Sequence, residues 1–122
     1  MKLKGMELLY NASAHFAAAN KYPEGLIKEL QKGGQESFDA LCWVLAETAK
    51  QAELMRRHLG ENPKDYPNED DFRVGLTIRQ LRTATEMAVN AVIKGLKGDE
   101  PDEDEEIDLG LLELESEKKS EN

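Results

Sequence analysis

The chain has few of the residues that build catalytic and metal centres. Its 122 residues include one cysteine, two histidines and one tryptophan, and aromatic residues make up only 6%. A single cysteine excludes an internal disulfide, so nothing here indicates an oxidising compartment. Zinc takes four Cys, His or acidic ligands at close spacing, and the sequence has no such cluster. We therefore expect no metal and no cofactor.

Long apolar runs are also missing. No segment approaches the roughly 18 apolar residues that a membrane-spanning helix needs. Lys2 and Lys4 give a basic start, but the apolar stretch of a signal peptide does not follow them. We therefore expect a cytoplasmic protein that does not bind membranes.

Positive charge is scarce overall, because the net charge is −9, but the imbalance is local. Residues 1–98 carry 14 Lys and Arg against 13 Asp and Glu, whereas residues 99–122 carry 2 against 12. A nearly neutral body with an acidic tail offers no basic field for a phosphate backbone, which disfavours nucleic-acid binding. The sequence predicts a folded domain over residues 1–98 and a largely disordered tail over residues 99–122.

Apolar spacing predicts an all-α domain of about four to five helices. The alanine-rich residues 11–20 favour a first helix with Asn11 or Ser13 as its cap. Pro23 favours the start of a second helix, which Gly33 ends. Residues 6–10 are apolar but too few for periodicity to separate a short N-terminal strand from the entry to a helix.

The longest predicted helix covers residues 37–59. Its apolar residues recur in steps of three and four, which places them on one stripe that we expect to be core. They are Phe38, Leu41, Cys42, Leu45, Ala49, Ala52, Met55 and Leu59. Trp43 is assigned to the core for the same reason, ahead of a role as an interface anchor. Gly60 and a loop rich in proline follow.

The last third of the domain predicts a short helical turn and a closing helix. Residues 68–72 begin with acids that suit a helix N-terminus, and Gly75 interrupts them. Thr77 and Gln80 have the spacing of a capping box, and Gly98 ends the helix that they open. The apolar face of that helix comprises Ile78, Leu81, Thr85, Ala88, Val92 and Leu96.

The candidate catalytic groups do not converge. His58 lies sixteen residues after Cys42 on the same predicted helix, about 24 Å along its axis, so the two cannot form a nucleophile pair. Cys42 lies on the apolar stripe and is expected to be a buried core residue. Residues 102–106 have acids at alternate positions, as in a calcium loop, but lack its glycine. The sequence therefore favours a protein without enzymatic activity.

Two further patterns concern a charged helix face and a group of apolar residues in the tail. Glu47 and Glu53 alternate with Lys50, Arg56 and Arg57, which is typical of a salt-bridged helix face. Within the acidic tail, an apolar island forms a candidate partner-binding segment, because such islands often fold on a partner. The island comprises Ile107, Leu109, Leu111, Leu112 and Leu114.

The order of these segments resembles the tail assembly chaperones of long-tailed (siphophage-type) bacteriophages and related prophages. The resemblance covers residues 6–98 and the character of the tail. It rests on element order: a short first helix, a break into Pro23, the long helix of residues 37–59, a proline-rich loop and a closing helix. No single motif carries it.

The resemblance implies a non-catalytic role in the host-cell cytoplasm. Members bind the tape measure protein, keep it soluble and recruit tail-tube subunits during virion morphogenesis. It also implies homo-oligomers. A longer form made by ribosomal frameshifting is implied too, and the codons of Lys118 and Lys119 suit the A-rich slippery stretch that such frameshifting uses.

Two other classes stay open. A small acidic regulatory or adaptor protein, including a nucleic-acid mimic, would account for the tail, although mimics usually spread their acids over a folded surface. A helix-turn-helix protein would use Arg79, Arg82, Lys94 and Lys97, which the charge balance disfavours.

Overall fold

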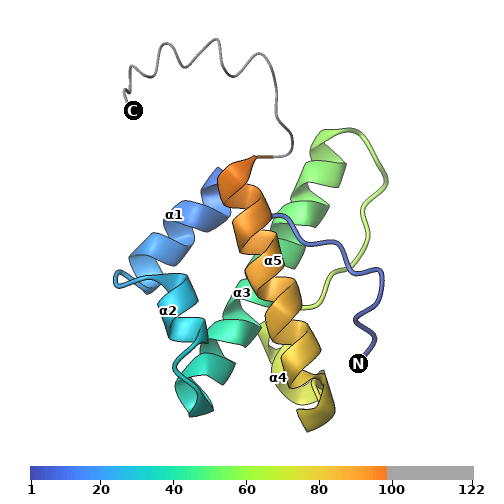
Figure 1. Ribbon diagram of the computed structural model, residues 1–122. Coiled ribbons are helices and arrows are strands. Elements are labelled where there is room, and N and C mark those ends of the chain that lie inside the picture. The colour runs from blue at the N-terminus through green and yellow to red at the C-terminus, as the bar shows by residue number, and fades with distance from the viewer. Residues whose placement is uncertain (99–122) are drawn as a thin grey trace, which may run out of the picture.

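The computed structural model describes residues 1–98, which form an all-α domain (Figure 1). Its elements are α1 (Ala12–Lys21), α2 (Leu26–Leu30), α3 (Gly34–His58), α4 (Glu69–Gly75), a 3₁₀ turn (Ile78–Gln80) and α5 (Leu81–Lys97). The predicted fold class is confirmed, except that no strand occurs within this part of the chain. The predicted tail, residues 99–122, lies outside the described residues.

Helix α3 is the centre of the domain, because α1, α2, α4 and α5 each pack against it. Its middle turns are buried, as the apolar stripe predicted, and α5 adds small residues that permit close packing. The fully buried positions include Val44, Leu45, Phe72, Ala84 and Val92. Trp43 and Phe38 pack against this core while partly exposed.

Side-chain caps fix several helix starts where the sequence predicted them. Asn11 caps α1, and its side-chain oxygen accepts the Ala14 N–H at 3.0 Å. Asn68 and Asp71 bond reciprocally at the start of α4, each at 2.8 Å. The Gln80 side chain accepts the Thr77 N–H at 3.1 Å, so the capping-box spacing marks a real boundary.

Two predicted helix boundaries are wrong. Helix α2 begins at Leu26 and not at Pro23, because Gly25 adopts a φ of 119° that no helix can include, and its N–H closes a turn on Tyr22. Helix α3 begins three residues before Ser37, at Gly34. The Ser37 hydroxyl instead lies inside the first turn and donates to the carbonyl oxygen of Glu29 at 3.0 Å.

The segment of residues 6–10 is neither strand nor helix. No neighbouring strand is present among residues 1–98 to pair with it, and its Leu9 N–H donates instead to the Thr48 carbonyl oxygen of α3 at 3.0 Å. Tyr10 is buried at its end. The segment therefore joins the core as an extended connection that leads into α1.

Helix α5 approaches this segment closely at Gly95. A methyl group at Gly95 would overlap the Tyr10 carbonyl oxygen and lie 2.8 Å from the Tyr10 Cβ. Gly95→Ala is therefore expected to lower the free energy of unfolding by about 1–3 kcal/mol, despite the better helix propensity of alanine. Chemical denaturation measures this loss.

The matched control is Asn90→Ala, at an exposed position of the same helix. We expect it to leave the stability within about 0.5 kcal/mol of the original chain. A Gly95→Ala chain as stable as Asn90→Ala would show that the close approach to Tyr10 does not exist.

Candidate interaction surface

The residues at the ends of the predicted apolar stripes are exposed, although they belong to the same helices as the buried core residues. Met55 and Leu59, expected in the core of α3, are 42% and 67% exposed. On α5, Leu96 is 60% exposed, and Ile78 in the preceding turn is 88% exposed. The burial predicted for Met55 and Leu59 is wrong, and the apolar face of α5 is likewise exposed at its ends, because neighbouring helices cover only the middle of each stripe.

Several exposed apolar side chains come from three helices that meet at one end of the domain. Residues 9–11 tie these helices together: Leu9 and Asn11 bond to Thr48 and Gln51 of α3 at 3.0 and 3.1 Å, and Tyr10 contacts Gly95 of α5. The start of α1 and the C-terminal parts of α3 and α5 therefore lie at the same end (Figure 1). We call this group the apolar end: Phe16, Leu54, Met55, Leu59, Ile93 and Leu96.

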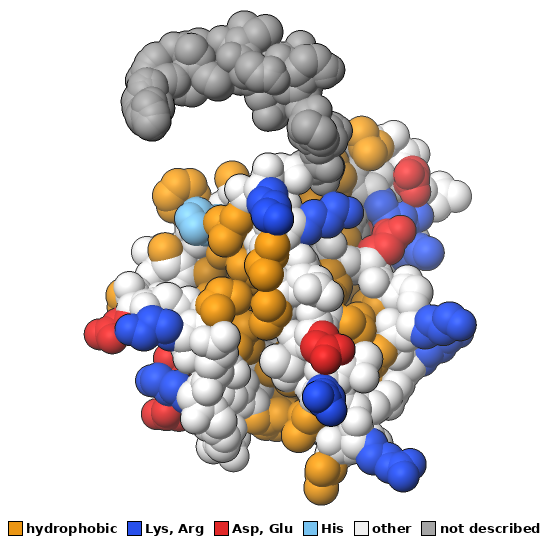
Figure 2. All heavy atoms as spheres, viewed as in Figure 1, with side chains coloured by type: hydrophobic (Ala, Val, Ile, Leu, Met, Phe, Trp, Pro, Cys, Tyr) orange, Lys and Arg blue, Asp and Glu red, His pale blue; other side chains and the backbone are white. Residues whose placement is uncertain are grey.

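Figure 2 shows how apolar side chains are distributed on one face of the molecule. They gather in a band between α1 and α5 that extends toward the end where the described chain stops. Basic side chains lie beside this end, where the last turn of α5 carries Lys94 and Lys97. Exposed apolar side chains gathered beside basic ones are typical of an interaction site.

Phe16 is the aromatic residue of the apolar end, and its side chain is 67% exposed. Its ring packs edge-to-face on His15, with centroids 5.6 Å apart. His15 is held in turn by Tyr10, whose hydroxyl lies 3.0 Å from the His15 Nδ1. Phe16 is therefore supported by a row of rings that reaches the buried Tyr10, which suits a preorganised anchor.

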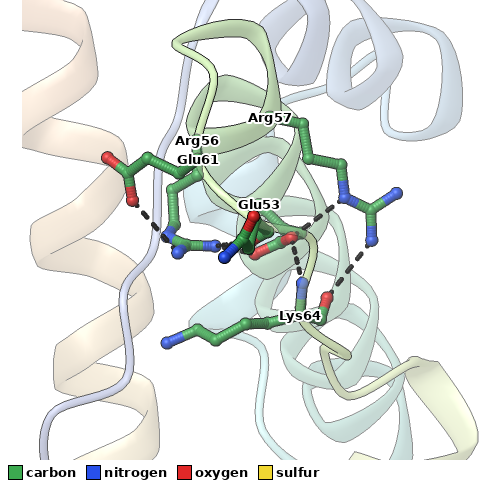
Figure 3. Close-up of polar contacts among 6 residues, drawn as sticks. Glu53, Arg56, Arg57, Glu61 and Lys64 are labelled. Carbon is green, nitrogen blue, oxygen red and sulfur yellow. Dashed lines mark hydrogen bonds and ion pairs between the residues drawn. The ribbon is translucent and has the colours of Figure 1, made fainter.

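A second cluster surrounds Glu53, near the C-terminus of α3 (Figure 3). Its carboxylate, 5% exposed, accepts from Arg56 at 2.8 Å, from Arg57 at 2.9 Å and from the Lys64 N–H at 2.7 Å. Arg56 also pairs with Glu61 at 3.0 Å. The predicted salt-bridged face is confirmed, and it fastens the loop after α3 back onto the helix.

This cluster gives a pH-dependent stability. The Lys64 N–H and then the Arg57 guanidinium lower the pKa of Glu53 to about 2. A depressed pKa stabilises the fold above the ordinary glutamate pKa near 4.5 and loses that effect as pH falls toward 2. We therefore expect Glu53→Gln to flatten the decline in stability below pH 5, as measured by denaturation at successive pH values.

Glu61→Gln is the control for this change, because Glu61 contacts Arg56 from an exposed position. It should keep the decline of the original chain. A decline that Glu53→Gln leaves unchanged would mean that Glu53 is not held ionised by these donors.

The candidate catalytic groups of the sequence stay apart. Cys42 is fully buried, as predicted, and burial raises the pKa of its thiol to about 11, which disfavours the reactive thiolate. Within residues 1–98, no three His, Cys, Asp or Glu side chains are grouped to hold a metal ion. None of the helices in that range combines the length and apolar character needed to cross a bilayer.

The predicted partner-binding residues, Ile107, Leu109, Leu111, Leu112 and Leu114, lie outside the described residues, as does the acidic run of residues 102–106. Sequence reasoning missed the apolar end. Its signal was present, because Leu54 and Ile93 lie off the predicted stripes and add apolar residues to turns that already carry Met55 and Leu96. No protein-family model, curated protein or solved structure matches this chain.

Proposed function

We propose that this chain is a non-catalytic chaperone of the phage tail assembly type, which binds apolar segments of the tape measure protein through the apolar end. In this role it keeps its partner soluble in the host cytoplasm, recruits tail-tube subunits and self-associates. The exposure of six large apolar side chains on helix segments that lie at one end of the domain (Figure 1) carries the proposal; they are Phe16, Leu54, Met55, Leu59, Ile93 and Leu96.

The chemistry of this surface suits an apolar helical partner. Its exposed side chains come from α1, α3 and α5, and large apolar groups of this kind are what the apolar face of an amphipathic helix binds. Phe16 supplies an aromatic anchor of the kind that dominates binding energy at interfaces. Leu54 and Met55 add flexible apolar contacts that adapt to different partner sequences.

Co-expression with a tape measure protein from the same genome tests this function. We expect the tape measure protein to be insoluble alone and soluble with this chain. Size exclusion with light scattering then gives the mass and stoichiometry of the complex. An insoluble tape measure protein beside a lone monomer of this chain would contradict the proposal and favour the adaptor or regulator class.

A further inference from the structure

We propose that residues 107–114 of this same chain dock on the apolar end and compete there with the partner. This inference rests on the proposed function, because it describes how the same surface is regulated. The segment is then an internal competitor that covers the apolar end until a partner displaces it. Three observations carry the proposal: where the described chain stops, how much chain follows, and the charges on both sides.

The described chain stops at the apolar end itself. Helix α5 ends at Lys97, directly after Leu96, and Gly98 follows as its cap. Nine residue steps separate Gly98 from Ile107, and at 3.3–3.6 Å per residue this connection reaches at most about 30 Å. A domain of this size has a radius of gyration of about 13 Å, so the connection spans the whole end. A short tether also gives a millimolar effective concentration.

The charges on the two sides are opposite. Residues 99–106 contain seven acids and no Lys or Arg. The last turn of α5 exposes Lys94 and Lys97 beside the point where the described chain stops. The acidic connection is therefore drawn along the basic side of the apolar end, with an attraction that salt weakens.

The apolar residues of the segment match an apolar surface. Ile107, Leu111 and Leu114 are spaced i, i+4 and i+7, which is the spacing of the anchors that an amphipathic helix lays into a groove. The other exposed apolar residues of the domain, Val74 and Ile78, belong to α4 and the 3₁₀ turn, at the opposite end of α5 from Gly98 (Figure 1). The apolar end is thus the exposed apolar surface that lies nearer to Gly98 and to the segment that follows it.

When the segment of residues 107–114 covers the apolar end, only the open molecules can bind a partner, so the apparent affinity is the intrinsic affinity multiplied by the open fraction. If about one molecule in ten is open, removing the competitor tightens partner binding about tenfold. The variant for this purpose is Ile107→Ser, Leu111→Ser and Leu114→Ser together, because it keeps the length and charge of the tail.

Paramagnetic relaxation tests the docking on the full chain without any partner. Ser116→Cys introduces a nitroxide site, and the fully buried Cys42 is not expected to compete for the label. We expect the label to attenuate the amide signals of Phe16, Leu54 and Ile93 and to leave those of Val74 and Ile78 intact. In the triple serine variant, the attenuation should largely disappear.

Two outcomes would overturn the proposal. The first is equal attenuation in the original tail and in the triple serine variant, which would reflect only the proximity of any tethered chain. The second is attenuation in a mixture of spin-labelled unenriched chains and ¹⁵N chains without a label, which would identify the occupant as a second copy. Because no tape measure protein is present, a failure of the proposed function would leave this result unchanged.

Discussion

Replacing Phe72 by alanine is expected to lower the free energy of unfolding by about 3–5 kcal/mol. Phe72 is fully buried and is the only buried residue of the seven-residue α4, so it supplies the apolar contact of this helix with the core that α3 provides. Domains of this size are stable by about 5–15 kcal/mol, so the loss consumes much of the total. Guanidinium unfolding followed by circular dichroism measures it.

Two variants frame this prediction. Val74→Ala changes the same helix at a position that is 87% exposed and should stay within about 0.5 kcal/mol of the original chain. Phe72→Leu keeps an apolar side chain of similar size and should cost less than the alanine, which preserves a measurable transition if Phe72→Ala does not fold. Equal midpoints for Phe72→Ala and Val74→Ala would show that α4 does not pack as described.

Most helices of this fold follow from local signals. Asn11, the Asn68–Asp71 pair and the Thr77–Gln80 pair satisfy free N–H groups at helix starts, and that chemistry depends only on residues close in sequence. The start of α2 could not be predicted in the same way. Pro23 suits a helix start, yet the unusual conformation of Gly25 depends on how the chain must turn to place α2 against α3.

The apolar end consists largely of residues at the ends of the apolar helix stripes, and sequence periodicity does not show where burial along a stripe stops. Steps of three and four identify the side of α3 that carries Leu45 and Met55, but not how far neighbouring helices extend along it. Leu45 lies where other helices pack and is fully buried, whereas Met55 lies beyond them. The pairing of Glu53 with Arg56 and Arg57 was predicted, but its bond from the Lys64 N–H was not, since that bond depends on the path of the loop.

Placing acids on the apolar end is expected to weaken partner binding strongly. Phe16→Asp with Leu96→Asp removes the aromatic anchor of α1 and an apolar contact of α5 and places two charges where the partner excludes water. We expect a loss of at least about 2 kcal/mol, or about 30-fold in affinity. Both side chains are 60% or more exposed, so folding should be preserved. Calorimetric titration with an apolar helical segment of the tape measure protein measures the loss.

The matched control is Val74→Asp with Ile78→Asp. It adds the same charge to exposed apolar residues at the α4 end, which are 87% and 88% exposed. Any general effect of acidic substitution on solubility or folding should appear equally in this control. Only the loss of the apolar end should separate the two double variants.

Co-expression of the tape measure protein with three forms of this chain is the most direct test of the account. The forms are the original chain, Phe16→Asp with Leu96→Asp, and Val74→Asp with Ile78→Asp, each analysed by size exclusion with light scattering. We expect a soluble complex with the original chain and with the α4-end variant, and none with the apolar-end variant. Equal recovery of the tape measure protein with all three forms would contradict the assignment of the apolar end as the binding surface.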